Sequence, residues 1–281
     1  MEINPLSLVN ILTLRYDPSI NPNLSPKSSK DFLADDNPID IQYVENLICN
    51  EMENKLKTLD DKELSVALSG GVDSTLVLTL LRKIRPEIKL HAVSIKFANS
   101  VDETPAASKI AEKFNAEHHI INLENYLSEL PKAISIVRLP FWDLHWYYVV
   151  KKSNTLSKTL LSGDGGDEIF GGYTFRYKKF LSLINNNSTP LEKTIAYLSC
   201  HERDRVPDQE KLFGKKSKFS WESIYQTLID YFDNSLSPIE QVFLADYNGK
   251  LLYNFNPINT KILNHFDVKP ISPLLSDDMI S

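Results

Sequence analysis

Short apolar runs alternate with stretches of helical periodicity along the middle of the chain. Four runs have the length and apolar character of buried strands: "LSVAL" (64–68), "IKLHAVSIKF" (88–97), "HHIINL" (118–123) and "KTLLS" (158–162). Between them, "STLVLTLLRKI", a segment from about 102–103 to 114 and a stretch around 146–152 carry helical patterns. Strands separated by helices predict a parallel sheet covered on both faces. We therefore expect an α/β fold with a doubly wound parallel sheet.

The regions on either side of this alternation have different patterns. Residues 1–40 include "YDPSINPNLSPKSSKDFLADDNP" and predict an irregular N-terminal connector. The run "PLSLVNILTL" is too short to span a bilayer, and we expect a buried helix or strand there. Apolar spacing predicts an amphipathic helix over 41–57 and a mainly helical region from about Phe175, broken at "INNNSTP". We expect one domain over 41–281, with an α/β core at about 60–180 and a helical remainder at 181–281.

Composition and charge exclude several classes of function. The formal net charge of −6 argues against a broad basic surface for nucleic acid. Cys49 and Cys200 form no CxxC pair, which argues against a structural zinc site or a disulfide framework and fits a reducing compartment. His118 and His119 adjoin a strand, but no spacing nearby suggests zinc. The N-terminus lacks the basic flank and cleavage site of a signal peptide. We expect a cytoplasmic protein without a membrane or nucleic-acid partner.

Seven of the nine glycines lie in two short segments, "LSGGVDST" (68–75) and "LSGDGGDEIFGGY" (161–173). Each segment follows a predicted strand and precedes a helix, so both lie at the carboxyl edge of the sheet, where ligands bind. Glycines there bring backbone N–H groups close to an anion, and the helix adds the positive end of its dipole. Ser69, Ser74 and Thr75 can add hydroxyl donors. The first segment therefore predicts a phosphate cradle, although glycines before a capped helix are also ordinary turn chemistry.

The carboxylates of the second segment narrow the kind of cradle. The chain lacks GxxxxGK[ST], the phosphate-binding motif of P-loop NTPases. It also lacks the dinucleotide-binding motif GxGxxG, which would need glycine where Glu168 stands. Asp164 and Asp167 reach the same edge as Asp73 of the first segment. Carboxylates repel phosphates unless a cation lies between them, so we expect Mg²⁺ held by Asp73 and Asp167. Glu168 has a simpler explanation as an acid in the first turn of a helix.

The same segments carry a resemblance to a known family. "SGGVDS" resembles the pyrophosphate loop of the ATP pyrophosphatases, which cleave ATP to AMP and pyrophosphate and have an adenine nucleotide alpha hydrolase-like, Rossmann-like fold. "LSGDGGDEIFGGY" resembles the narrower second motif of the synthetase domain of asparagine synthetase, shared with β-lactam synthetase. "VDETPAASKIAEKFNAEHHII" is similar to that family's second helix and third strand. The resemblance covers about residues 64–177 and implies a ligase that activates a carboxylate with ATP and then forms an amide.

The resemblance also implies roles for individual residues. Asp73 and Asp167 would bind Mg²⁺, and Asp73 and Asp164 are the candidate catalytic residues. Asp164 stands where many family members carry Glu, and would move protons in the amidation step. Five residues of the first segment would hold phosphates: Ser69, Gly70, Gly71, Asp73 and Ser74. Four positions would surround the nucleoside, largely through main-chain atoms: Ala67, Val93, Ser162 and Gly163.

Besides Asp164, three features differ from the family's pattern. Glutamine-dependent members begin with an amidohydrolase domain whose N-terminal Cys is the nucleophile, whereas this chain begins with "MEINPL", so we expect ammonia or a separate glutaminase to supply nitrogen. A later motif similar to "EVRVPFLD" is reduced to "VKPISPLLS" (268–276), with Lys269 and Ser276 in place of its acids and Asp267 nearby. In the family, helices that follow this motif include a phosphate-contacting lysine, and we expect this chain to end before them. Candidate replacements are Lys250, Lys261 and Lys269.

The sequence leaves three functions open. The first, which we expect, is an ATP- and Mg²⁺-dependent synthetase that activates the side chain of aspartate as β-aspartyl-AMP and amidates it to asparagine. The second keeps the adenylation but uses another carboxylate, as β-lactam synthetase does, and Lys269 in place of Glu favours it. The third is a nucleotide-binding subunit that is active only with a partner chain, such as a separate C-terminal subunit.

Overall fold

The computed structural model describes residues 4–22, 24–32, 40–59, 61–98, 100–139, 144–201, 209–213 and 215–280. The chain forms two compact units. One consists of Met1–Asp35 and Phe170–Ile258, and we call it the helical unit. The other consists of Asp36–Ile169 and Asn259–Ser281, and we call it the α/β unit.

The α/β unit contains all the strands that the described residues form. Its elements are α2 (Ile41–Lys57), β1 (Glu63–Ala67), α3 (Val72–Ile84), β2 (Lys89–Phe97), α4 (Thr104–Lys113), β3 (Ala116–Leu123), α5 (Leu130–Val137), α6 (His145–Ser153), β4 (Thr159–Leu161), β5 (Lys269–Ile271), the 3-10 helix η5 (Pro273–Leu275) and α14 (Asp277–Ile280). The chain crosses from one unit to the other within two helices, α7 (Gly166–Phe170) and α13 (Asn256–Phe266). The predicted strands and helices of this region are confirmed, with ends shifted by a few residues.

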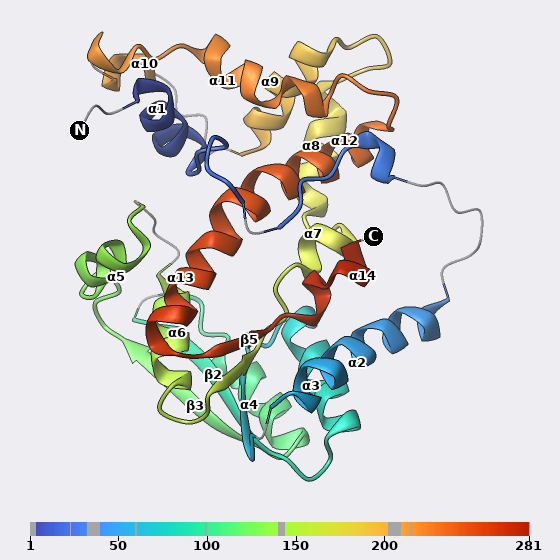
Figure 1. The fold of residues 1–281 in the computed structure, drawn as a ribbon, viewed down its shortest axis with the longest axis vertical. Helices are drawn as coiled ribbons and strands as arrows, with labels where there is room; N and C mark the ends of the chain where they lie inside the picture. Colours follow the sequence, from blue (N-terminus) through green and yellow to red (C-terminus); the bar gives the residue numbers. More distant parts are fainter. Residues whose placement is uncertain are drawn as a thin grey trace. The chain divides into compact units, whose positions relative to one another are not determined.

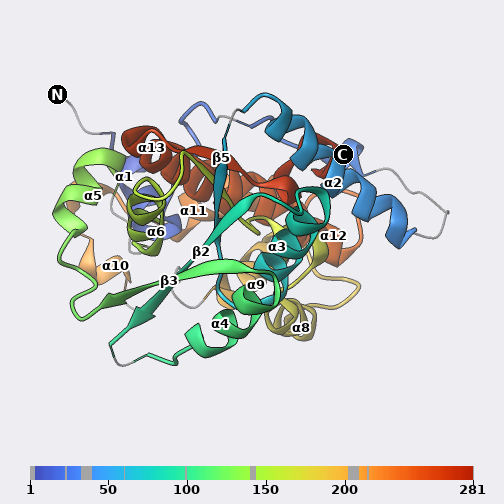
Figure 2. The ribbon, with the colours of Figure 1, turned by 90° about the horizontal axis from the view of Figure 1, so that it is seen from below.

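The five strands form one parallel sheet in the order β3-β2-β1-β4-β5. The chain moves from β1 outward through β2 to β3, and then returns to the other side of β1 for β4. Helix α4 packs on β2 and β3, and α6 packs on β2, β3 and β4. Figure 2 shows α4 and α6 on opposite sides of these strands. This arrangement confirms the predicted doubly wound parallel sheet.

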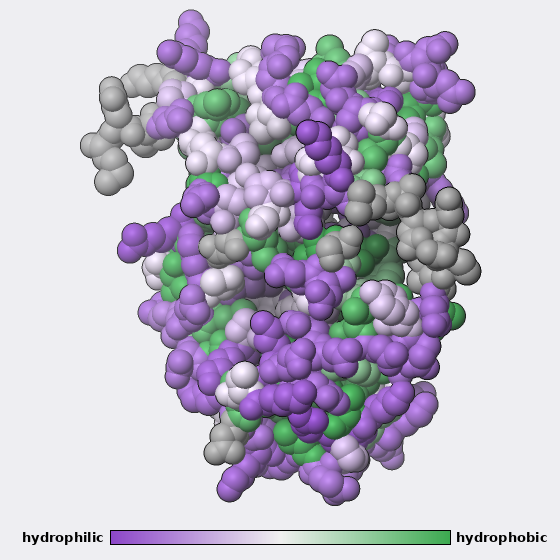
Figure 3. Space-filling view, turned by 45° about the vertical axis from the view of Figure 1, so that its right-hand side comes forward, coloured by the Kyte–Doolittle hydropathy of each residue, from purple (hydrophilic) through white to green (hydrophobic). Residues whose placement is uncertain are grey.

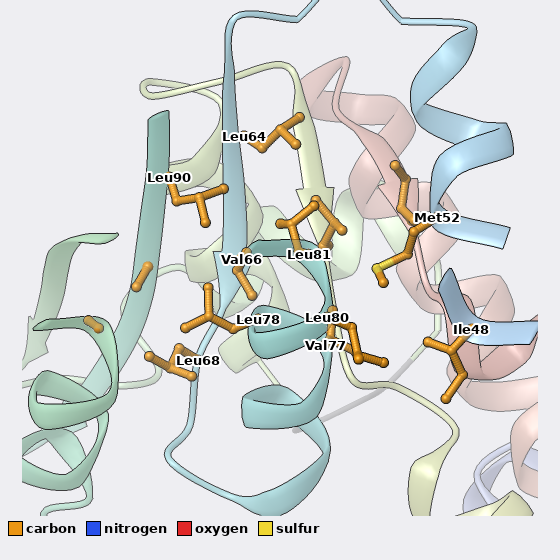
Figure 4. Close-up of a cluster of buried hydrophobic side chains, with 14 of the residues drawn as sticks. Ile48, Met52, Leu64, Val66, Leu68, Val77, Leu78, Leu80, Leu81 and Leu90 are labelled. Carbon is orange, nitrogen blue, oxygen red and sulfur yellow. The ribbon is translucent and has the colours of Figure 1, made fainter. Parts of the chain in front are cut away.

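The main core of the α/β unit lies between the sheet and the helices α2 and α3 (Figure 4). Leu64 and Val66 of β1 are fully buried, and α3 buries Leu78 and Leu81 against them. In α2, Met52 lies one turn beyond Ile48, so both side chains share the face that packs on this cluster. Burying a side chain of this kind stabilises the fold by about 1.5–3 kcal/mol. This packing fixes the start of α3 next to the end of β1.

Strand β5 was not predicted from the hydrophobic pattern. It is three residues long and contains Pro270, which lacks a backbone N–H group. Proline is tolerated there because β5 is an edge strand. Its pairing with β4 brings residues 259–281 into the α/β unit. In the predicted division of the chain, residues 259–281 belonged to the helical remainder. The domain boundaries that we expected from the sequence remain a prediction.

The helical unit has a separate hydrophobic core. Helix α1 buries Val9 and Leu14 in that core, together with Phe180 and Phe232. The apolar run near the N-terminus is therefore a helix, within a segment that we expected to be an irregular connector. The elements of this unit are α1 (Pro5–Leu14), η1 (Ser29–Asp31), α8 (Thr174–Leu183), α9 (Pro190–Cys200), α10 (Gln209–Leu212), η2 (Lys215–Ser217), α11 (Trp221–Leu228), η3 (Ile229–Tyr231), α12 (Pro238–Asp246) and the π-helical segment η4 (Tyr247–Phe255), which Figure 1 shows in sequence colours. The predicted helical region with its polar break before residue 190 is confirmed.

One face of the protein is largely polar. On the face shown in Figure 3, hydrophilic side chains predominate and hydrophobic side chains form scattered groups. Every helix in the described part of the chain falls short of the length and apolarity needed to cross a membrane.

Candidate active site

The two glycine segments lie side by side at the carboxyl edge of the sheet. The first joins β1 to α3, and the second joins β4 to α7, where β1 and β4 are neighbouring strands. The direction of the chain across the sheet reverses between these two strands, and ligands bind at such a reversal in doubly wound folds. A Cβ atom on Gly163 would lie 2.6 Å from the carbonyl carbon of Asp73, and one on Gly166 would lie 2.4 Å from its Cγ. Only glycine leaves room at these positions, so the two segments meet at Asp73.

Hydrogen bonds within the first segment shape its loop. The Gly71 N–H group donates to Ser69 Oγ at 3.1 Å, and the hydroxyls of Ser69 and Ser74 lie 3.1 Å apart. Thr75 Oγ1 donates to the carbonyl of Gly71 at 2.7 Å. These hydroxyls were expected to donate to phosphates, and in the structure they hydrogen-bond within the loop. Helix α3 starts directly after Gly71, so its first N–H groups have no partner inside the helix and its positive dipole end lies at the loop.

Gly70 shows why the loop needs glycine. Its φ angle is +87°, in the region that residues with a side chain rarely adopt. A Cβ atom there would also lie 3.2 Å from the backbone nitrogen of Ala107 in α4. The loop is therefore held between the end of β1 and the start of α4.

Asp73 and Asp167 are the predicted magnesium ligands, and the structure brings them close together. Burial raises the pKa of Asp73, and the negative charge of Asp167 raises it further. Both side chains are partly exposed. Two carboxylates beside an anion cradle form the kind of hard oxygen donor set that Mg²⁺ prefers. A cation between them would relieve their repulsion, so these residues fit the ion.

Asp164 has a carboxyl group suited to proton transfer. Burial raises its pKa to about 7, the hydrogen bond from Ser162 opposes this rise, and the charge of Glu168 adds to it. Ser162 Oγ donates to Asp164 Oδ2 at 2.7 Å, and the Asp164 side chain keeps partial exposure. A carboxyl group with a pKa near 7 can both accept and donate a proton at neutral pH.

A pocket of about 230 Å³ lies next to the loop, on the β2 side. Val93, predicted to lie beside the adenine, lines this pocket and accepts a hydrogen bond from the Leu68 N–H group at 2.9 Å. Ala67 pairs in register with Val93. Pocket residues that the sequence did not point to are Ser94, Ile95, Phe97, Glu103, Thr104, His145 and Val149. Two of them, His145 and Val149, belong to α6, and the others lie on β2 or at the start of α4.

The C-terminal segment, residues 268–276, contacts the second glycine segment. Ser162 N donates to the carbonyl of Ile271 at 3.1 Å, and the hydroxyls of Ser162 and Ser272 lie 3.0 Å apart. Gly165 has a φ angle of +90°, and a Cβ atom there would lie 2.2 Å from Leu275 Cδ2. The only sequence signal for these contacts was the weak similarity of "VKPISPLLS" to a family motif.

Three residues that could replace the family's acids and its lysine lie away from the glycine segments. Lys269 is the first residue of β5 and pairs with the first residue of β4, at the amino end of the sheet. The Asp267 side chain is 92% exposed and forms an ion pair of 3.7 Å with Lys158. Lys261 Nζ donates to the carbonyl of Val137 at 2.9 Å. These contacts of Lys269, Asp267 and Lys261 do not involve the glycine segments.

The comparison with known proteins agrees with this geometry. Residues 54–268 match the family described as asparagine synthase. The chain belongs to this family. It is 35% identical over 124 residues to a putative asparagine synthetase [glutamine-hydrolyzing] 2 of Methanocaldococcus jannaschii, which covers 42% of this chain and 24% of that protein. It is 29% identical over 188 residues to asparagine synthetase [glutamine-hydrolyzing] 1 of Bacillus subtilis, which covers 60% of this chain and 29% of that protein.

The chain therefore spans less than a third of the length of these two relatives. Among solved structures, the NMN synthetase from Francisella tularensis is similar with a TM-score of 0.41 and 15% sequence identity, over 76% of this chain and 94% of that one.

Proposed function

We propose that this protein is an ATP- and Mg²⁺-dependent, AMP-forming amide synthetase that converts the side-chain carboxylate of aspartate to an amide through β-aspartyl-AMP. The observation that carries the proposal is the meeting of the two glycine segments at Asp73, where Gly163 and Gly166 leave room for its backbone and its carboxylate. Membership of the asparagine synthase family supports the same conclusion.

The first half-reaction joins two anions, so charge must be neutralised and the reactants held in line. The nucleoside would lie in the pocket beside Val93, with its phosphates on the loop that precedes α3. Asp73 and Asp167 would hold Mg²⁺, which when bound neutralises phosphate charge and stabilises the leaving pyrophosphate. The backbone N–H groups at the start of α3 would stabilise the same charge.

The second half-reaction needs a base. Ammonia attacks the acyl carbon, the bond from that carbon to the AMP oxygen breaks, and the nitrogen must lose a proton. Asp164, with a pKa raised to about 7, would accept that proton and later release it to solvent. The hydrogen bond from Ser162 orients the carboxylate for this task.

The direct test is incubation with ATP, Mg²⁺, aspartate and ammonium, followed by assays for pyrophosphate and asparagine. Asp73→Asn and Asp167→Asn should each lower turnover by at least about 100-fold, comparable to removing a group that stabilises transition-state charge. Asp267→Asn is the matched control, because it removes an exposed carboxylate at the other end of the sheet and should leave turnover unchanged. Full activity in either of the first two variants would refute the metal assignment.

The acceptor and the nitrogen source can be tested separately. A panel of carboxylic acids would distinguish aspartate from another acceptor, since each activated acid releases pyrophosphate. Glutamine in place of ammonium should support turnover only with a separate glutaminase. Turnover by the isolated chain would exclude the third function, a subunit that is active only with a partner.

The free thiols of Cys49 and Cys200 support a cytoplasmic location.

A further inference from the structure

Two histidines and a glutamate meet on the sheet of the α/β unit, toward the amino ends of its strands. His91 lies on β2, and Glu117 and His119 lie on β3. His91 pairs in register with Glu117, and His119 follows two positions later, so all three side chains leave the same face of the sheet. The glycine segments, in contrast, leave the carboxyl ends of β1 and β4. The cluster therefore serves no step of the proposed reaction.

The three side chains present donor atoms in a compact triangle. His91 Nδ1 lies 3.0 Å from His119 Nε2 and 3.6 Å from Glu117 Oε2, and His119 Nε2 lies 3.5 Å from Glu117 Oε1. In a tetrahedral zinc site with bonds of about 2.0–2.1 Å, neighbouring donor atoms are about 3.3 Å apart. The three observed separations lie close to this value. The two that involve Glu117 reach different oxygens of its exposed carboxylate, and a rotation of that side chain would present one oxygen to both histidines. The remaining vertex of the tetrahedron would be left to a water molecule.

A fourth side chain prepares His91 to act as a ligand. His91 Nε2 lies 2.8 Å from Glu63 Oε2. Because a carboxylate can only accept, the Nε2–H group of His91 donates this hydrogen bond. The lone pair of Nδ1 then points into the triangle. A carboxylate that holds the outer nitrogen of a ligating histidine is a recurring feature of zinc sites, and it strengthens the ligand. The His91 side chain is 3% exposed, so its orientation is held by packing.

Charges around the cluster affect how readily it can bind a cation. Lys89 Nζ lies 3.2 Å from Glu63 Oε1 and 3.9 Å from Glu117 Oε2. The positive charge of Lys152 in α6 also reaches His119. Lys89 is 53% exposed and can turn toward solvent when a metal takes its place.

We propose that His91, Glu117 and His119 bind one Zn²⁺ ion, with Glu63 as the outer partner of His91. Two imidazoles and a carboxylate are a donor set that zinc favours. The ion would tie the edge strand β3 to β2, and through Glu63 to β1. The sequence did not indicate this site, because His91 lies 28 residues from His119 and only strand pairing brings them together.

The test is calorimetric titration of the metal-free, full-length chain with Zn²⁺, in excess Mg²⁺ to occupy Asp73 and Asp167. One zinc ion per chain is expected. Glu117→Gln, which changes an exposed side chain and so spares the fold, should weaken binding by more than the about 10–100-fold that loss of an outer partner costs. Glu63→Gln should fall within that range. Zinc should also raise the melting temperature of the parent chain, and a chelator should reverse the rise.

His118→Asn is the matched control. His118 is adjacent to His119 but faces the other side of the sheet, where its ring nitrogens lie 2.8 Å from Ser94 Oγ and 2.9 Å from Ser108 Oγ. This variant should bind zinc like the parent chain. The proposal is overturned if the parent chain binds no zinc at micromolar concentrations, or if Glu117→Gln binds it as tightly as the parent. In either case, the four side chains form only a chain of hydrogen bonds.

Discussion

Replacing Asp164 by Asn removes a carboxyl group that the fold holds among buried neighbours. Asn is nearly the same size, and its amide oxygen can accept the hydrogen bond that Ser162 Oγ donates at 2.7 Å. The substitution therefore changes the charge at this position and little of the packing. It tests whether burial keeps the carboxyl group protonated up to neutral pH, because Asn stays neutral at every pH.

The sign of the effect follows from proton binding. The pKa of the Asp164 carboxyl rises from its ordinary value of 3.8 to about 7 because the folded chain buries it. Between these values the unfolded chain binds fewer protons than the folded chain, so the free energy of unfolding falls as pH rises from about 4 to about 7. A difference of about 3 in pKa corresponds to about 4 kcal/mol at pH 8, at about 1.4 kcal/mol per pH unit. Partial exposure of the side chain makes this an upper bound.

The assay is urea unfolding of the parent chain and the variant at pH 5 and pH 8, without ATP or Mg²⁺, followed by circular dichroism. The difference between the two proteins isolates Asp164, since all other titrating groups are shared. The stability of Asp164→Asn relative to the parent should increase by about 2–3 kcal/mol between pH 5 and pH 8. A difference that stays constant over this range, or an advantage that moves to the parent at pH 8, would show that the fold does not raise the pKa of Asp164.

Three further predictions concern other parts of the molecule. Gly166→Ala places a Cβ atom 2.4 Å from Asp73 Cγ and should lower pyrophosphate release by about 10–100-fold with little change in melting temperature; unchanged release would contradict the contact. The rate of amide formation should rise with pH through about 7 as Asp164 ionises, so a flat pH–rate profile would exclude it as the base. In the helical unit, Arg176→Met removes the guanidinium that lies 3.6 Å from the buried carboxylate of Asp246, which keeps a hydrogen bond from Tyr197 and its neighbour His201, and should lower the free energy of unfolding in urea by about 1–3 kcal/mol; an unchanged free energy would show that this ion pair does not stabilise the unit.

Local patterns were sufficient to predict most elements of the α/β unit. Helix α2 begins and ends where the apolar spacing predicts, because the spacing of Ile48 and Met52 places both side chains on one helical face. Strands β1, β2 and β4 were recognisable because each contains a run of buried residues next to a turn, and β3 was recognisable from its short run "HHIINL" although its side chains are partly exposed. Strand β5 was not, since three residues that include Pro270 carry no period, and only pairing with β4 makes them a strand.

The sequence was sufficient to predict that two glycine segments with acidic residues reach the same edge of a parallel sheet, since both follow a strand and precede a helix. The tertiary structure decided which atoms meet there. The contact of Gly163 and Gly166 with Asp73, the raised pKa of Asp164 and the support from Ser272 all depend on β1, β4 and β5 lying side by side. The triangle of His91, Glu117 and His119 likewise depends on the register of β2 and β3. Strand order and register arise from burial of the whole sheet, and no short stretch of sequence encodes them.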